Sequence, residues 1–429
     1  MANTKHQIVI VGAGSGGIMV AANALRKRKN LDIAIIDPAD FHYYQPAWTL
    51  VSADVYDYEK TKRPMEKYIP KGAKWIKDKV AELDPDNNQV KLASGDTVSY
   101  DYLVMSPGLQ NRPDLVEGLA ETLGKNNVCS VYTDPLYAKE VLMNFKSGNG
   151  LFTFPDTPLK CPGAPQKVAY LVSDRLNKKS ILNHGAKVIY AFPGGICFGV
   201  EPFKTRLYEI NEERGIVLKH AYSLVKIDGP NKKAYYKQTK TENADGGPIT
   251  MNDPNNEIKE TETEDGLKVI DCEVCHLAPP QRAFEWVQKS KLAHQDGPDK
   301  GWMKVDQFTM QNPDYSNVFG VGDTIAVPTA RTGAAIRKQA PVVVDNILAL
   351  IDGKPITSHH YNGYSSCPLV TGKGRMLLAE FGYGGKRMSD PLLSKFVDTS
   401  REKWTMWLLK KYGLPFIYWN KMLKGKMMD

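Results

Sequence analysis

Gln7-Ile-Val-Ile-Val-Gly-Ala-Gly-Ser-Gly-Gly17 is the stretch that decides the fold of this 429-residue chain. Gln7–Val11 is apolar and rich in β-branched residues, so the pattern predicts a strand. A glycine-rich turn follows at once, and Ile18–Arg28 has the spacing and composition of a helix. A strand, a glycine-rich turn and a helix in this order are typical of a unit that binds a dinucleotide.

Three glycines of the turn have roles in such a unit. Gly12 permits the tight turn, Gly14 lets the backbone approach a pyrophosphate, and Gly17 lets the helix pack closely on the strand. The N-terminus of the helix offers N–H groups to phosphates. The second predicted strand, Leu31–Ile36, ends at Asp37, where a carboxylate takes the ribose hydroxyls. A plain glycine-rich turn would not explain this acid.

Two later segments favour FAD over NAD. Tyr102–Gly108 is a strand that runs into a small-residue turn, and Asn317–Asp323 is a strand that ends in Gly-Asp, with helical character from Thr332. Both resemble the second and third FAD contacts of flavoproteins with two dinucleotide-binding domains. On that resemblance the cofactor-binding residues are Gly12, Gly14, Gly17, Asp37, Gln45, Val80, Pro107, Gly108, Gly322, Asp323 and Lys338.

A second Rossmann-like unit is expected at about residues 146–275, and its turn differs from the first. Gly150–Phe154 is a good strand, and Gln166–Arg175 has helical character. Between them stands Pro155-Asp-Thr-Pro-Leu-Lys-Cys-Pro-Gly-Ala-Pro165, in which prolines stiffen the loop and no second G-x-G-x-x-G occurs. Cys161 therefore stands where a nicotinamide cofactor would otherwise be bound. This substitution argues against a pyridine-nucleotide dehydrogenase and for thiol chemistry at the flavin.

Three stretches carry a specific family resemblance. Asp40–Leu50, Phe152–Lys167 and Tyr364–Gly372 are similar to sulfide:quinone oxidoreductases, and most similar to the type II branch, which includes the mitochondrial enzyme. The likeness covers nearly the whole chain. It implies two Rossmann-like domains, a bound FAD and a C-terminal segment that attaches to a membrane.

The resemblance also implies an activity. The enzyme would oxidise hydrogen sulfide to sulfane sulfur and pass the electrons through FAD to quinone, either ubiquinone or menaquinone. Cys161 and Cys367 match the two redox-active cysteines of the family, and Cys129 falls where the type I branch has a further one. One sulfur would take up hydrosulfide as a persulfide while the other delivers two electrons to the flavin. A thiol, sulfite or further sulfide would then remove the sulfane sulfur.

Three other functions stay open. A type II NADH:quinone dehydrogenase would share the fold and the tail, although the missing second glycine motif disfavours it. The flavin subunit of a sulfide dehydrogenase would pass electrons to a cytochrome. A flavoprotein sulfide sensor would be reduced by sulfide without turning over quinone.

The remaining cysteines are given no part in this chemistry. Cys197 fits a small buried side chain. Cys272-Glu-Val-Cys-His276 has the spacing of a c-type haem attachment pattern. We nevertheless expect no haem, because Leu267–Leu277 is predicted to be one strand, which would send residues three apart to opposite faces. No second ligand pair has the spacing of a zinc site, so no metal is predicted.

The tail combines aromatic and basic residues. Lys395–Lys426 contains Trp404, Trp407, Tyr412, Phe416, Tyr418 and Trp419, interleaved with Lys395, Arg401, Lys403, Lys410, Lys411, Lys421, Lys424 and Lys426. Such a mixture favours the membrane interface and anionic headgroups. The spacing of Trp404, Trp407, Leu408 and Lys411 predicts one amphipathic face, and Gly413–Pro415 predicts a break between two short helices. A helix pair that caps the core is the alternative.

Composition sets further limits. The net charge of +8 suits an anionic surface, but no nucleic-acid-binding motif is present. No cleavable targeting sequence and no apolar run of about 18 residues is visible, so no transmembrane helix is expected. The sequence therefore predicts a peripheral, monotopic protein on the cytoplasmic face of the cell membrane, and it leaves a homo-oligomer open.

The predicted domains follow from these segments. Residues 1–145 and 276–355 would form the FAD-binding domain, and 146–275 the second Rossmann-like domain, with a polar surface loop near 239–266. Residues 356–429 would carry the strand of Cys367, the quinone site and the membrane-binding helices. Phe381 and Tyr383 are the residues suggested for the quinone route.

Overall fold

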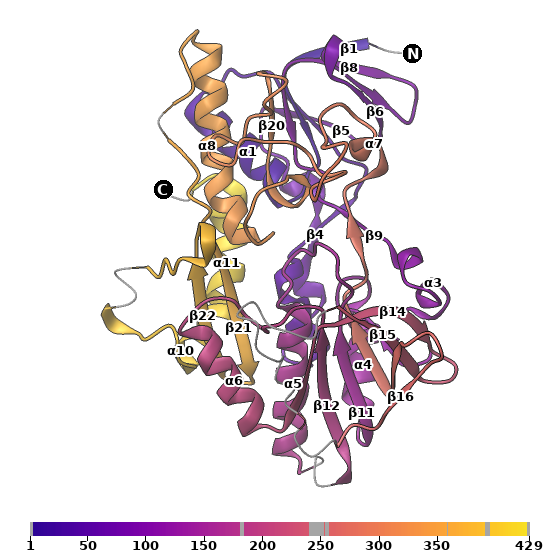
Figure 1. The fold of residues 1–429 in the computed structure, drawn as a ribbon. Helices are drawn as coiled ribbons and strands as arrows, with labels where there is room; N and C mark the ends of the chain where they lie inside the picture. The colour runs from indigo at the N-terminus through magenta and orange to yellow at the C-terminus, as the bar shows by residue number, and fades with distance from the viewer. Residues whose placement is uncertain are drawn as a thin grey trace.

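The computed structural model describes residues 3–180, 184–239, 253, 257–357, 359–390 and 395–426. Its first sheet has seven strands, in the order β5-β2-β1-β8-β7-β6, with β20 also paired to β8 (Figure 1). Strands β5, β2, β1, β8 and β20 are parallel, and β7 and β6 are antiparallel additions. The bounds are β1 (Asn3–Val11), β2 (Ile33–Ile36), β5 (Ala73–Ile76), β6 (Val80–Asp84), β7 (Gln89–Leu92), β8 (Thr97–Met105) and β20 (Val318–Gly320).

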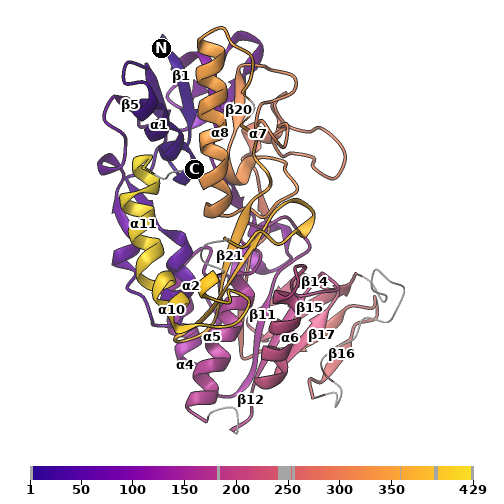
Figure 2. The same cartoon turned by 90° about the vertical axis from the view of Figure 1, so that its left-hand side faces the viewer.

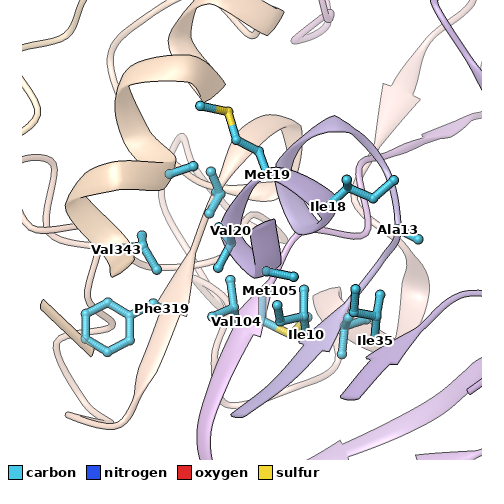
Figure 3. Close-up of a cluster of buried hydrophobic side chains, with 14 of the residues drawn as sticks. Ile10, Ala13, Ile18, Met19, Val20, Ile35, Val104, Met105, Phe319 and Val343 are labelled. Atoms are coloured by element: carbon cyan, nitrogen blue, oxygen red, sulfur yellow. The ribbon is translucent and has the colours of Figure 1, made fainter. Parts of the chain in front are cut away.

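Two helices cover one face of this sheet. They are α1 (Ser15–Lys27) and α8 (Gly333–Ile351). Figure 3 shows Val20 of α1 and Val343 of α8 packed with Ile10, Val104 and Phe319 of the strands. Burying one such side chain contributes about 1.5–3 kcal/mol to folding. The segments predicted to contact FAD are thus held on one continuous core.

A second sheet of five parallel strands lies below the first in Figure 1, in the order β10-β18-β11-β12-β13. It includes β10, which lies before residue 146, where the second Rossmann-like unit was expected to begin. The bounds are β10 (Val128–Cys129), β11 (Gly148–Thr153), β12 (Ala186–Phe192), β13 (Ile216–His220) and β18 (Val274–Leu277), with α4 (Pro135–Asn144), α5 (Ala164–Lys178) and α6 (Phe203–Glu213) as its helices. Because parallel strands end at one edge, the turn after β11 opens at the carboxyl edge of this sheet.

An antiparallel sheet in the order β14-β15-β17-β16 flanks it. Its strands are β14 (Tyr222–Asp228), β15 (Lys233–Gln238), β16 (Glu260–Glu262) and β17 (Lys268–Asp271). The prediction of one strand over Leu267–Leu277 is wrong, because the chain leaves β17 at Asp271 and enters β18 of the other sheet at Val274. The predicted polar loop near 239–266 lies largely outside the described residues.

Short elements join the larger ones. They are β3 (Phe41–Tyr43), β4 (Lys62–Pro64), β9 (Gln110–Asn111), β19 (Gln281–Arg282), α2 (Trp48–Ser52), α3 (Leu119–Thr122) and α7 (Glu285–Gln288). The hairpin of β21 (Ser365–Gly372) and β22 (Arg375–Phe381) follows α8 and packs against α5. The prediction of an α/β chain with Rossmann-like units is confirmed.

The tail is one helical rod that runs along both units (Figure 2). It consists of α10 (Trp404–Leu408), a π-helical turn (Leu409–Gly413), α11 (Leu414–Asn420) and a last 3₁₀ turn (Met422–Lys424). The predicted break at Gly413–Pro415 is wrong. Gly413 has helical dihedral angles, and Pro415 lies in the first turn of α11 behind the wider π turn, which accommodates its missing N–H.

The predicted amphipathic face of the tail is also wrong in one respect. Trp407 is buried with Met406 against the β21–β22 hairpin, while Trp404 is exposed. Tyr418 and Trp419 are buried beside α1 and the aromatic residues Tyr44 and Tyr68. Half of the tail therefore caps the core, and the other half faces outward. No helix among the described residues is long and apolar enough to cross a bilayer.

Candidate active site

Cys161 lies in the turn between β11 and α5. Its backbone φ of 46° is positive, a conformation that residues other than glycine seldom adopt. Three hydrogen bonds hold it: Cys161 N donates to Arg331 O (3.0 Å), Ala164 N donates to Cys161 O (2.9 Å), and Tyr132 Oη donates to Cys161 O (2.9 Å). Backbone strain of this kind persists where the surroundings fix it, and it is frequent at active sites.

Cys367 reaches the same place from β21. The two thiols are in hydrogen-bonding contact. Gly163 lies beside this thiol, since a Cβ added there would stand 3.4 Å from Cys367 Sγ, an ordinary contact distance. The fold thus brings together the two cysteines that the sequence singles out, although they come from different halves of the chain.

Lys167, in the first turn of α5, makes this pair asymmetric. Its ammonium nitrogen lies 3.1 Å from Cys161 Sγ, and its side chain is buried. The hydrogen bond from Cys367, together with the charge of Lys167, holds the pKa of the Cys161 thiol well below its ordinary value. The same hydrogen bond, and burial, raise the pKa of Cys367. Cys161 is therefore the thiolate and Cys367 the thiol of the pair.

A second buried lysine comes from the tail. Lys410 Nζ donates to the carbonyl oxygen of Pro46 at 2.9 Å, and its charge acts on both cysteines and on Lys167. Burial, followed by repulsion from Lys167, lowers the pKa of Lys410 to about 8. Two ammonium groups thus face a sulfur pair in a buried site, which favours anions there.

Cys129 has a different setting. It is fully buried in β10, and burial raises the pKa of its thiol. Among the described residues, no hydrogen bond links it to Cys161 or Cys367. A neutral buried thiol of this kind has little nucleophilic character.

The turn between β1 and α1 has the geometry of a dinucleotide cradle. Gly12 has a φ of +99°, and a Cβ added to it would stand 2.3 Å from Ser106 O. A Cβ on Gly17 would stand 1.9 Å from Gly12 O, so glycine is needed for the close approach of helix and strand. A Cβ on Gly14 would meet no atom within 4 Å, so the backbone there is open to a ligand.

Comparison with known proteins fits this geometry. The family described as pyridine nucleotide-disulphide oxidoreductase matches residues 6–140. The mitochondrial sulfide:quinone oxidoreductase of Dictyostelium discoideum is 38% identical over 98% of this chain and 86% of its own length. The chain belongs to the sulfide:quinone oxidoreductase family. The mitochondrial sulfide:quinone oxidoreductase of Mus musculus is 35% identical over 99% of this chain and 88% of its own length.

A solved structure supports the fold of the family. The sulfide:quinone oxidoreductase of Aquifex aeolicus superposes with a TM-score of 0.77, covering 98% of this chain and 92% of that chain at 19% identity. At this identity the likeness shows the fold alone. It agrees with two sheet-and-helix units and a C-terminal hairpin.

FAD, the cofactor of the sulfide:quinone oxidoreductase family, fits the residues of the first unit. Gly14 leaves an open backbone for phosphate oxygens at the N-terminus of α1. The carboxylate of Asp323 follows β20, and within the described residues no donor is hydrogen-bonded to its side-chain oxygens. Burial raises the pKa of Asp323, whereas Lys160 and Arg331 lower it. A flavin side chain with hydroxyl groups would satisfy such an acceptor.

The carboxylate of Asp37 uses part of its hydrogen-bonding capacity within the protein. It accepts hydrogen bonds from Ala13 N (2.6 Å) and Ala39 N (2.8 Å), and burial raises the pKa of Asp37. These bonds hold the end of β2 against the turn. The carboxylate keeps further acceptor capacity, and its contact with the ribose stays a prediction.

The other predicted FAD residues come from several elements of the chain. Gln45 Oε1 accepts from Lys160 Nζ at 2.6 Å, and Gly322 N donates to Gln339 Oε1 at 2.9 Å. Gly108 has a φ of +73° and open space at its Cβ position. Pro107 follows β8, Val80 begins β6, and Lys338 lies within the first two turns of α8. Their contacts with the flavin stay predictions.

Phe381 and Tyr383, suggested for the quinone route, face different neighbours. Phe381 ends β22 and packs its ring edge-on to Phe198, with centroids 6.1 Å apart. Tyr383 Oη donates to Gln307 O at 2.5 Å, and its ring packs on Tyr361. The structure therefore does not show the two side chains lining one common pocket, and their role in the quinone route stays a prediction.

Sequence reasoning missed Lys167 and Lys410. Lys167 stands six residues after Cys161, so its place in the first turn of α5 is a signal that could have been used. Lys410 was grouped with the lysines expected at the membrane surface, and the structure buries it beside the cysteines instead. The burial of Lys410 depends on the path of the tail in the folded protein, which the sequence pattern does not give.

Proposed function

We propose that this chain oxidises hydrogen sulfide to sulfane sulfur at Cys161 and Cys367 and reduces a quinone, with FAD as the cofactor between the two substrates. The observation that carries this proposal is the Lys167 ammonium 3.1 Å from Cys161 Sγ, in a pair where Cys367 contacts the same sulfur. Family membership supports the substrates, since the relatives are named sulfide:quinone oxidoreductases.

The asymmetry of the pair assigns the sulfur step. In its oxidised form the pair is a Cys161–Cys367 disulfide. Hydrosulfide attacks Cys367 Sγ, the S–S bond breaks, and Cys161 leaves as the thiolate that Lys167 stabilises. Cys367 then holds the incoming sulfur as a persulfide. When bound, FAD supplies a two-electron acceptor between the cysteine pair and quinone.

The persulfide sulfur must then be removed by a nucleophile. A thiol, sulfite or further sulfide is an anion at neutral pH, wholly or in part, and the charges of Lys167 and Lys410 favour its approach. The identity of this acceptor is part of the proposal, as is the choice of ubiquinone or menaquinone as the quinone. A role for Cys129 in the sulfur step also stays a prediction.

We also propose that the outer side of the tail binds a membrane surface. Trp404, Tyr412 and Phe416 are 60–63% exposed and recur four or eight residues apart, which in a helix places them on one side. Exposed Lys403 and Lys421 flank them. Aromatic and basic side chains together favour the headgroup region, where a lipid-soluble quinone is at hand. The cytoplasmic face stays a prediction.

The membrane proposal has a direct test. We expect the chain to co-sediment with vesicles of anionic phospholipid, and the triple variant Trp404→Ser, Tyr412→Ser, Phe416→Ser to stay in the supernatant. The matched control replaces Leu115, Leu136 and Phe308, which are exposed on other elements, by serine. Equal sedimentation of both triple variants would contradict the assignment.

The activity is tested by anaerobic titration of the FAD-loaded protein. Sulfide should bleach the flavin absorbance, and a soluble quinone should restore it. NADH should leave the absorbance unchanged, because the turn after β11 lacks the glycines that a pyrophosphate needs. Bleaching by NADH and indifference to sulfide would move the chain to the NADH dehydrogenase class. Bleaching by sulfide without reoxidation by quinone would indicate a sensor.

A further inference from the structure

Cys272 and Cys275 form a second pair of thiols. They line the same surface recess and belong to the same buried cluster, although the sequence pattern predicted that they would face opposite ways. The reason is the change of sheet: Cys272 stands in the connection between β17 and β18, and Cys275 is the second residue of β18. The C-x-x-C motif is therefore left unused by haem chemistry, since His276 is buried and its Nε2 accepts from Val131 N at 3.2 Å.

The pair is far along the sheet from the active site. Cys161 follows the carboxyl end of β11, and Cys272 precedes the amino end of β18, the parallel neighbour of β11. The two thiol pairs thus lie at opposite edges of one sheet. A reaction at Cys272 and Cys275 would not interfere directly with Cys161.

The backbone holds the pair in place. Cys272 N donates to Lys232 O (2.8 Å), Glu273 N to Asn149 O (2.8 Å) and Cys275 N to Asn127 O (2.9 Å). These three acceptors belong to three different segments. The two sulfurs are therefore kept together before any reaction takes place.

A narrow surface recess borders the pair. It is lined by both cysteines together with Val128, Gly229 and Lys232, and it has no room for a whole water molecule. Cys272 is 7% exposed and Cys275 1%. A reagent from solvent would therefore meet Cys272 first, at the surface, and not enter between the two thiols.

We propose that Cys272 and Cys275 are a second thiol–disulfide site that takes sulfane sulfur from small hydropersulfides or inorganic polysulfides. Cys272 Sγ, as thiolate, attacks one sulfur of HS–SH, the S–S bond of the reagent breaks, and hydrosulfide leaves. Cys275 Sγ then attacks Cys272 Sγ of the resulting persulfide, and a second hydrosulfide leaves. Overall, two thiols and one HS–SH give one disulfide and two H₂S, so the thiols are oxidised and the sulfane sulfur is reduced.

The order of the two attacks follows from the surroundings. The hydrogen bond with Cys272, and burial, raise the pKa of Cys275, so Cys275 keeps its proton until Cys272 has reacted. The source of the polysulfide in the cell rests on the proposed function, whose product is sulfane sulfur. The reaction at Cys272 and Cys275 does not rest on that function, because the polysulfide can be added to the purified protein.

The test uses the full chain loaded with FAD, with Cys161→Ser and Cys367→Ser introduced so that the active site is silent. Sodium disulfide is added anaerobically, free thiols are blocked, and peptides are mapped by mass spectrometry without reduction. We expect the peptide with residues 272–275 to lose the mass of two hydrogens. Adding Cys275→Ser should abolish this loss and leave one extra sulfur on Cys272.

Cys197→Ser is the matched control, since Cys197 is a half-buried thiol outside both pairs, and it should leave the crosslink unchanged. The proposal would be overturned if the blocking reagent were found on both thiols, at positions 272 and 275. It would also be overturned if extra sulfur were found on Cys129 or Cys197 in place of Cys272. Such a failure leaves the sulfide titration of the unmodified chain untouched, so the two proposals are separable.

Discussion

The turn between β1 and α1 has four glycines in six residues, whereas the turn between β11 and α5 has Cys161 among prolines. Both turns lead from a parallel strand into a helix at the carboxyl edge of a sheet. The first exposes backbone N–H groups because side chains are absent, as the open space at Gly14 shows. The second uses the same edge to present a sulfur and, one turn into α5, the ammonium of Lys167.

One architecture thus serves two chemistries. A turn without side chains binds phosphates through the backbone and the helix dipole, and it tolerates no Cβ at Gly17. A turn fixed by hydrogen bonds can hold a cysteine at positive φ, and its chemistry then depends on side chains. Substitutions should therefore have different consequences at the two turns.

Replacing Cys161 by serine should have the largest effect. We expect flavin reduction by sulfide to slow by at least about 10³-fold, because a hydroxyl forms no disulfide and does not leave as a thiolate. Stopped-flow absorbance of the anaerobic protein mixed with sulfide measures the rate. FAD content and unfolding temperature should match those of Cys197→Ser, the control. A wild-type rate in Cys161→Ser would show that the second turn carries no sulfur chemistry.

A pair of substitutions tests the first turn. In Gly17→Ala the Cβ would overlap Gly12 O, so we expect a loss of about 1–3 kcal/mol of stability and loss of FAD. In Gly14→Ala the Cβ has open space in the protein, so stability without FAD should be unchanged while FAD binds less tightly. Thermal unfolding and flavin fluorescence measure both. Equal stability losses in the two variants would mean that backbone exposure is not what distinguishes Gly14.

Replacing Lys167 by methionine should affect only the second turn. The ammonium helps to hold the pKa of Cys161 down, so its removal raises that pKa and lowers the thiolate fraction at neutral pH. A rise of one unit slows alkylation of Cys161 by about tenfold, and the rate recovers as the pH is raised. Rates of iodoacetamide labelling across pH measure this. Lys178→Met, at the exposed end of the same helix, is the control.

The smallest expected effect is that of Tyr418→Phe. Tyr418 Oη is hydrogen-bonded to Ser15 Oγ (2.6 Å) and to His42 Nε2 (2.5 Å), so it ties the tail to the first turn. We expect a loss of about 0.5–1.5 kcal/mol of stability and somewhat weaker FAD binding, with unchanged labelling of Cys161. Chemical denaturation and fluorescence titration check it. Altered Cys161 labelling would show that the two turns are coupled through the tail.

The sequence was sufficient for the parts that depend on local pattern. The glycine turn, Asp37 and the strands that end at Met105 and Gly320 are each specified by neighbours in the chain. The pairing of Cys161 with Cys367 came from the family resemblance, because nothing local joins residues in different halves of a chain. Their contact is a property of the β21 hairpin packed on α5.

The electrostatics of the site could not be predicted in this way. A lysine in a basic, aromatic tail has the same pattern whether it faces lipid or enters the core, and only tertiary packing buries Lys410. The same limit applies to Cys272 and Cys275, whose contact depends on the chain changing sheets between them. Periodicity describes one element at a time, and it fails where an element ends unexpectedly.

The helical tail has a consequence for the synthesis of the protein. Lys410 and Tyr418 leave the ribosome after every strand of both sheets, yet one acts on the cysteine pair and the other on the glycine turn. Both sheets and both cysteines are complete before these residues emerge. A chain truncated before Trp404 would therefore fold most of its core but lack the last groups around both turns. Completion of the active site therefore waits for the synthesis of the tail, and a product that ends before Trp404 is released without assembled sulfur chemistry.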